Sequence, residues 1–133
     1  MELDPPAVGV YVDLRMAHYS DALIKGSDRE IALRFYYFPF GTKRIPLERI
    51  VEVREHDMGE GISGGRWRIW GSGDLVHWMP LDTRRPKKRT MFILFIDGSS
   101  TRPCVTPDHP EAFKKYLTER GVKLSPLDKP YED

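Results

Sequence analysis

Hydrophobic and polar residues alternate most regularly between positions 30 and 38. Apolar or aromatic residues stand at 31, 33, 35 and 37, and charged residues stand at 30 and 34. A repeat of two is typical of a β-strand, because successive side chains point to opposite faces. The pattern predicts a strand over 30–38 with one face formed by Ile31, Leu33, Phe35 and Tyr37. The other face is expected to carry Glu30, Arg34 and Tyr36.

Shorter apolar segments bounded by turn residues predict the remaining strands. They cover 8–14, 22–25, 43–46, 50–56, 66–70, 75–79, 91–96 and 102–106. Val51 and Val53 are expected on the inner face of the 50–56 strand. The 91–96 segment has no polar residue, which predicts a strand buried on both faces. Asp97-Gly98 then predicts a hairpin, and Pro103 indicates an edge strand or a bulge.

One helix is predicted after the last strand. Asp108 is a good N-cap, and Glu111 stands three positions later, as in a capping box. Pro110 suits the first turn, and Gly121 suits the position just after the helix ends. The apolar stripe is expected to contain Phe113, Tyr116 and Leu117, together with Ala112. Lys114 and Lys115 are expected to face water.

This order of elements predicts a mainly β fold. A long antiparallel sheet tends to close on itself, because closure removes its unpaired edges. We therefore expect an antiparallel β-barrel of about seven strands, capped by one C-terminal α-helix. A β-sandwich with a packed helix is the alternative. The chain, 1–133, is expected to form a single domain, with a flexible N-terminus at 1–7 and a C-terminal tail at 124–133.

Composition agrees with one globular domain, because 40% of the 133 residues are hydrophobic and 31% are charged. The formal net charge is +1, so no overall field favours a nucleic-acid partner. Cys104 is the single cysteine and cannot form an internal disulfide. The sequence shows neither a signal peptide nor an apolar run of about 20 residues, which a membrane span needs. These features predict a cytoplasmic protein without a transmembrane segment.

The segment 44–53 reads Arg-Ile-Pro-Leu-Glu-Arg-Ile-Val-Glu-Val and resembles a turn and strand of bacterial pleckstrin-homology-like (PH-like) proteins. The Arg-Ile-Trp-Gly segment at 68–71 and the Asp-x-Pro-Glu-x-Phe segment at 108–113 fit the same pattern. The resemblance covers roughly 21–120. It implies a PH-like barrel that binds a protein or peptide, with self-association as a further expectation. Some members hold phosphoinositides through a basic loop, but the loop at 25–29 has only two basic residues around an acid.

A basic loop at 84–89 is the densest charge on the chain, with five basic residues in six positions. Such a cluster can bind a phospholipid headgroup or another anion. The candidate anion-binding residues are Arg84, Arg85, Lys87, Lys88 and Arg89, joined by Lys43 and Arg44. The alternative is a solvated loop whose charges protect the adjacent apolar strand from aggregation.

A second candidate surface comes from the hairpin predicted over 66–79. It combines arginine with tryptophan, a mixture that is enriched at protein interfaces. The candidate partner-binding residues are Arg66, Arg68, Trp70 and Trp78. The alternative is cation–π packing inside the fold.

No catalytic pattern is evident in the sequence. The segment 59–64 matches G-x-G-x-x-G, but a strand is expected after it, whereas a dinucleotide site needs a helix. The four histidines lack metal-ligand spacing, and no Gly-x-Ser-x-Gly elbow is present. We therefore expect a binding module that is not an enzyme and carries no cofactor or metal.

Overall fold

The computed structural model describes residues 18–37, 41–58, 68–72 and 75–126. Its strands are β1 (Tyr19–Ser20), β2 (Ile24–Gly26), β3 (Glu30–Tyr37), β4 (Gly41–Pro46), β5 (Ile50–Asp57), β6 (His77–Trp78), β7 (Thr90–Ile96), β8 (Arg102–Val105) and β9 (Leu124–Pro126). The helix is α2 (Pro110–Glu119), and two short 3-10 turns are η1 (Leu47–Arg49) and η2 (Arg85–Lys87). The expected strand at 8–14 and the expected flexible segment at 1–7 lie outside the described residues.

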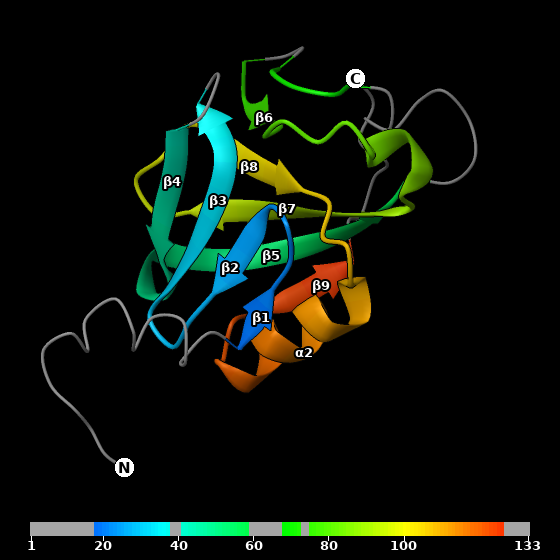
Figure 1. Cartoon of the computed structure of the whole chain (residues 1–133). Coiled ribbons are helices and arrows are strands. Elements are labelled where there is room, and N and C mark those ends of the chain that lie inside the picture. Colours follow the sequence, from blue (N-terminus) through cyan, green and yellow to red (C-terminus); the bar gives the residue numbers. More distant parts are fainter. Residues whose placement is uncertain (1–17, 38–40, 59–67, 73–74, 127–133) are drawn as a thin grey trace, which may run out of the picture.

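The strands form two sheets, which confirms the mainly β prediction (Figure 1). The first sheet is antiparallel in the order β1-β2-β3-β4, and the second has the order β6-β8-β7-β5-β9. In the second sheet β6 and β9 run parallel to their neighbours. No strand pairing joins the two sheets within the described residues, so these strands do not form a closed barrel. None of the helices in the described part of the chain is long and apolar enough to cross a membrane.

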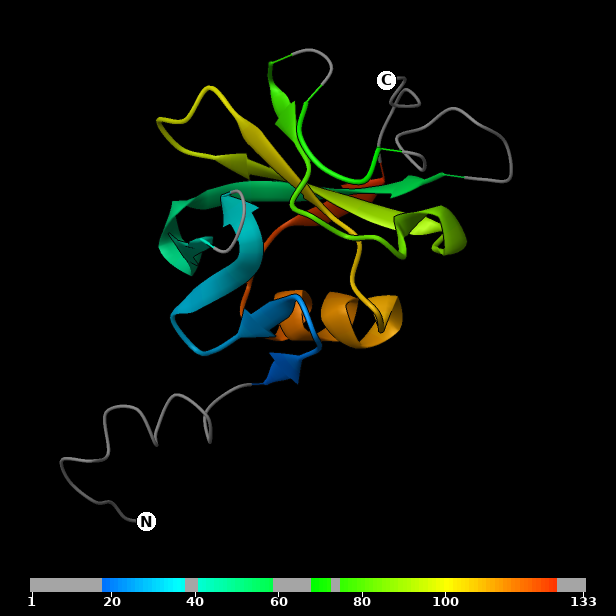
Figure 2. The same ribbon diagram turned by 45° about the horizontal axis from the view of Figure 1, so that its top comes forward.

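The main core lies between the two sheets and is covered at one end by α2. The helix contacts β1 of the first sheet and β9 of the second, as Figure 2 shows. Phe113, Tyr116 and Leu117 are buried, which confirms the predicted apolar stripe. They pack with residues from both sheets, including Leu33 and Phe92. The helix therefore stabilises the contact between the sheets.

β7 is buried on both faces, as predicted. Phe92 and Leu94 belong to the main core, whereas Met91 and Ile93 belong to a second cluster on the opposite face. The other buried members of this second cluster are Met58, Met79 and Cys104. The strand has no alternation of polar and apolar residues because both of its faces are covered.

The predicted faces of β3 are wrong beyond Leu33. Phe35 has a φ of 59°, and the pairing with β4 shifts between Leu33 and Tyr37. This irregularity reverses the alternation, as a β-bulge does. Tyr36 is therefore buried, and Tyr37 is 51% exposed. The bulge leaves Phe35 half-buried.

A similar shift corrects the prediction for β5. Its pairing with β7 changes register between Ile50 and Glu52. Val53 is fully buried as expected, but Val51 is 60% exposed. One displaced residue at the strand's start is enough to turn Val51 toward solvent.

The start of α2 differs from the prediction. His109, not Asp108, occupies the N-cap position, and no side chain caps the helix. The Asp108 carboxylate instead contacts Lys88 at 2.7 Å, an ion pair that the local sequence does not reveal. Ala112 is exposed, so it lies outside the apolar stripe.

The end of α2 follows the prediction. Gly121 has a φ of 77°, the left-handed conformation that glycine adopts without strain. The backbone N–H of Val122 donates to the carbonyl of Leu117 at 3.0 Å, and that of Gly121 donates to Thr118 at 3.1 Å. This pair of bonds is the usual glycine-terminated helix end.

Three further boundaries depart from expectation. Residues 68–70 do not form a strand, and the link to the 75–79 segment is a single bridge between Gly71 and Met79. β6 pairs with β8, so β8 is not an edge strand despite Pro103. The expected C-terminal tail begins with β9, which pairs with β5. Pairing between distant segments decided the last two cases.

Candidate functional site

The basic loop predicted at 84–89 is divided by the fold between the interior and the surface. η2 turns the chain so that the side chain of Arg85 points inward, and Arg85 is only 1% exposed. Its neighbour Arg84 keeps 65% of its side chain exposed. Lys88 is nearly buried, with 12% of its side chain exposed, whereas Lys87 and Arg89 are exposed.

The Arg85 guanidinium is held by four hydrogen bonds inside the protein. Its Nη1 donates to the carbonyls of Arg68 at 2.6 Å and Ile69 at 3.0 Å, and its Nη2 donates to Pro80 at 2.8 Å. Its Nε donates to the Thr106 hydroxyl at 3.2 Å. Burial lowers the pKa of Arg85 to about 10, although the charge of Asp82 opposes this effect. The group therefore stays charged near neutral pH.

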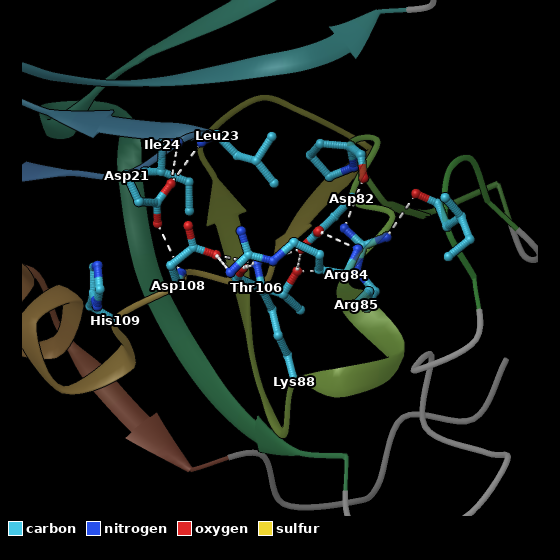
Figure 3. Close-up of polar contacts among 12 residues, drawn as sticks. Asp21, Leu23, Ile24, Asp82, Arg84, Arg85, Lys88, Thr106, Asp108 and His109 are labelled. Carbon is cyan, nitrogen blue, oxygen red and sulfur yellow. Dashed lines mark hydrogen bonds and ion pairs between the residues drawn. The ribbon is translucent and has the colours of Figure 1, made fainter.

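Asp82 and Lys88 complete a buried polar cluster, which we define as Asp82, Arg85, Lys88, Thr106 and Asp108 (Figure 3). Asp82 accepts from Lys88 at 2.8 Å and from the Thr106 hydroxyl at 2.6 Å. Lys88 also donates to the Thr106 carbonyl at 2.7 Å and contacts Asp108 at 2.7 Å. Each charge of the cluster therefore has an opposite charge or a hydrogen-bond partner inside the fold.

Asp108 connects this polar cluster to the turn between β1 and β2. Burial alone would raise the pKa of Asp108, but the hydrogen bond and charge of Lys88, with the charge of Arg84, lower it. The backbone N–H of Asp108 donates to the Asp21 carboxylate at 2.9 Å. Asp21 also accepts from the backbone N–H groups of Leu23 at 2.7 Å and Ile24 at 2.8 Å. The polar cluster thus fixes the position of that turn.

A surface groove of about 210 Å³ lies between this turn and the segment 81–84. The apolar part of its lining is Ala22, Leu23, Phe35 and Leu81, and we call the last three the floor. Its polar side consists of Asp82, Thr83, Arg84 and Asp108. The backbone N–H of Leu81 donates to the Phe35 carbonyl at 3.0 Å, which joins the two sides of the floor.

Two exposed arginines stand at this groove. Arg84 is part of its wall, and its Nη2 lies 3.5 Å from Asp108. The guanidinium of Arg34 lies 5.2 Å from the centre of the Phe35 ring, and its Nη1 donates to the Ala22 carbonyl at 3.2 Å. Arg34 therefore contacts two residues that line the groove.

The other predicted anion-binding residues do not meet in one place. Arg89 pairs with Asp57 at 2.9 Å, and Arg44 pairs with Glu30 on the adjacent strand. The Lys43 ammonium lies 5.3 Å from the Tyr36 ring centre. β4, which carries Lys43 and Arg44, lies on the opposite side of the domain from the 84–89 loop in both views (Figures 1 and 2).

The predicted tryptophan surface is partly assembled. The rings of Trp70 and Trp78 meet edge to face with centres 5.0 Å apart. The Trp78 indole N–H donates to the Tyr36 carbonyl at 3.0 Å, and both tryptophans are half-buried. Arg68 contributes its backbone carbonyl to Arg85, and Arg66 lies outside the described residues. These tryptophans therefore pack on the fold as well as facing its surface.

Sequence reasoning missed the groove's floor and the acidic members of the polar cluster. One signal was present, because Leu81 and Asp82 interrupt an otherwise basic and polar loop. An acid among basic residues indicates a local ion pair, and an apolar neighbour indicates a contact with the fold. Their meeting with Phe35 and Asp108 depends on contacts across long separations.

In the part of the chain that the structure describes, no group of three or more His, Cys, Asp or Glu side chains could hold a metal ion. Comparison with protein-family models, with curated proteins and with solved structures finds no match.

Proposed function

We propose that this protein is a non-enzymatic interaction module that binds a protein or peptide segment in the groove beside the polar cluster. One observation carries the proposal, namely an apolar floor set next to a polar side whose two carboxylates, Asp82 and Asp108, are held by Lys88. Binding sites commonly combine an apolar surface with a few placed polar groups. The volume of about 210 Å³ suits one side chain of a partner better than a whole small-molecule ligand.

The state of the carboxylates favours binding over catalysis. A general acid or base must reach the substrate's proton, and a nucleophile must face the substrate. Asp82 accepts hydrogen bonds from Lys88, Thr106 and the backbone of Arg84. Asp108 is held by Lys88 at 2.7 Å. Both groups therefore serve the fold's own contacts.

We further propose that the chain is a distant PH-like module. Two largely antiparallel sheets followed by a C-terminal helix support this assignment. The parallel strand β9 after the helix is a departure from the simple barrel that the sequence predicts. A second copy of the chain is one partner that the proposal includes, and light scattering at several protein concentrations would detect it.

The alternative of an anionic lipid surface has less support from the geometry. Polybasic membrane contacts usually use about four to eight cationic side chains close together. Arg85 and Lys88 hold the polar cluster, and Arg89 pairs with Asp57. Arg84 lies 3.5 Å from Asp108, so within the described residues Lys87 is the exposed basic residue of the loop without a close carboxylate.

The experiment is selection of displayed random decapeptides on the immobilised protein, followed by NMR titration of the selected peptides into ¹⁵N-labelled protein. We expect the amide signals of Leu23, Phe35 and Leu81 to move. Leu81→Ser should weaken binding about tenfold, because it removes part of the apolar floor. Val51→Ser is the matched control, since Val51 is exposed and lies outside the groove.

Peptides that bind without moving the groove signals would contradict the proposal. Equal losses in Leu81→Ser and Val51→Ser would also contradict it. Retention of the far-UV and near-UV circular dichroism in both variants excludes unfolding as the cause of a loss.

A further inference from the structure

We propose that the groove selects a peptide segment in which a carboxylate stands next to a large apolar side chain. This inference rests on the proposed function and adds the chemistry of the partner. The apolar side chain would lie on Leu23, Phe35 and Leu81. The carboxylate would bind Arg84, and Arg34 would add a second positive charge at the same groove.

The charge balance of the groove supports an acidic partner. In the polar cluster, the carboxylates of Asp82 and Asp108 are balanced by the buried Arg85 and the nearly buried Lys88. Arg84 is therefore a positive charge beyond the balance of the polar cluster. The nearby Asp21 carboxylate is held by the Tyr19 hydroxyl and by backbone N–H groups, including that of Asp108. Arg34 has no carboxylate contact within the described residues, and its contacts are the Phe35 ring and the Ala22 carbonyl.

Arg84 can exchange its present contact for a ligand. Its distance to the Asp108 carboxylate, 3.5 Å, is longer than a good hydrogen bond, and 65% of its side chain is exposed. Asp108 also has a contact of 2.7 Å with Lys88, which would leave it a counter-charge if Arg84 moved away. A partner carboxylate would gain the two parallel hydrogen bonds that arginine offers, without leaving Asp108 unpaired.

The floor of the groove is prepared for an apolar side chain. Phe35 is held at a φ of 59°, which is unfavourable for a side chain with a Cβ, and bonding between Leu81 and the Phe35 carbonyl fixes it there. Strained residues are concentrated at binding and catalytic sites. The Arg34 guanidinium lies 5.2 Å from the centre of the Phe35 ring, so a positive charge stands beside this apolar surface.

A peptide fits these features better than a lipid surface. A membrane would contact a broad basic area, whereas the groove offers two arginines around a small apolar floor. Figure 3 shows Arg84 directed toward Asp108 at the side of the polar cluster. Because 65% of the Arg84 side chain is exposed, a single partner carboxylate can reach it. The complementary partner is therefore acidic and apolar within a few neighbouring residues.

The test compares three synthetic peptides of the same length, each flanked by glycines and blocked at both ends. The first contains Asp-Leu-Asp, the second Asn-Leu-Asn, and the third Asp-Gly-Asp. Binding is measured by NMR titration of the ¹⁵N-labelled full chain at low and at moderate salt. We expect the first peptide to move the groove signals, and each of the other two to bind about tenfold more weakly.

The matched variants are Arg34→Gln with Arg84→Gln, and Arg44→Gln as an exposed arginine outside the groove. The double variant should lose the preference for the Asp-Leu-Asp peptide, and the control should keep it. Equal binding of the Asp-Leu-Asp and Asn-Leu-Asn peptides at the groove would overturn the inference but leave the proposed function intact. If neither these peptides nor the selected decapeptides move the groove signals, both proposals fail.

A vesicle-binding experiment distinguishes a peptide partner from an anionic lipid surface. Sedimentation with vesicles containing phosphatidylserine should leave the protein in solution at moderate salt. Co-sedimentation that is lost in the double variant would assign the arginines to a membrane surface and overturn the inference.

Discussion

Arg84 and Arg85 are neighbours in the sequence and carry the same charge, yet the fold uses them in opposite ways. Arg85 is 1% exposed and donates to three backbone carbonyls and one hydroxyl. Arg84 has 65% of its side chain exposed and makes one long contact with Asp108. A dense run of positive charge is therefore not by itself a binding surface, because part of it can hold the interior together.

Substitution of a buried arginine of the loop should also change the stability more than substitution of an exposed one. A buried ion pair that loses one partner leaves the other charge and its hydrogen-bonding groups unsatisfied. An exposed arginine loses little, because water replaces its contacts. The largest difference in unfolding free energy is therefore expected between substitutions at the adjacent positions 84 and 85.

Arg85→Ala should lower the free energy of unfolding by about 3–5 kcal/mol, because three carbonyls and Asp82 lose their donor or counter-charge. Arg84→Ala should change it by less than about 0.5 kcal/mol. Urea denaturation followed by circular dichroism measures both values. If Arg85→Ala does not fold, Arg85→Lys supplies the test and should be clearly less stable than Arg84→Lys. Similar losses of unfolding free energy at the two positions would show that Arg84 and Arg85 contribute equally to stability.

Asp108→Asn should lower the free energy of unfolding by about 2 kcal/mol at pH 7, because its bond to Lys88 loses the negative charge. The folded state lowers the pKa of Asp108, so the ionised carboxylate stabilises the fold. This stability is complete above the unfolded pKa, about 3.9, and is lost as the pH falls through the folded value.

The difference between Asp108→Asn and the unsubstituted protein should therefore narrow as the pH falls below about 4. Denaturation at pH 7, 5, 4 and 3 checks the trend. A difference that stays constant over this range would show that the carboxylate's charge has no part in the stability of the cluster.

The smallest expected change in stability concerns the strained backbone of Phe35 in the floor of the groove. Phe35→Ala and Phe35→Gly both remove the ring, but only glycine relieves the left-handed backbone, at a φ of 59°. The glycine variant should be more stable than the alanine variant by about 1 kcal/mol. Thermal unfolding of the two variants provides the comparison. An alanine variant as stable as the glycine variant would indicate that residue 35 is not strained.

Much of the architecture was predictable, because it depends on local patterns. The alternation at 31 and 33, the apolar run 91–96 within β7 and the stripe of Phe113, Tyr116 and Leu117 each indicate which side chains are buried. The end of α2 followed from Gly121, since a left-handed residue after a helix favours glycine. Such signals lie within a few residues of the feature they determine.

The exceptions arise where one residue changes the register or a distant partner intervenes. The bulge at Phe35 reverses the faces of β3, and no glycine, asparagine or aspartate at that position indicates it in the sequence. The Asp108 side chain had a good local role as a helix cap, but Lys88 and Arg84 lie close enough to bind it instead. β9 and β6 gained their places through parallel pairing, which no short-range pattern encodes.

For the candidate site, the sequence by itself determined which charges are available and that they are concentrated at 84–89. It also determined that no strong motif for metal binding or catalysis is present. The tertiary structure decided which charges are buried, because Asp82, Thr106 and Asp108 come from separate segments and meet Arg85 and Lys88 only when the chain folds. Charge is a property of each residue, but its availability to a partner depends on the neighbours that folding brings to it.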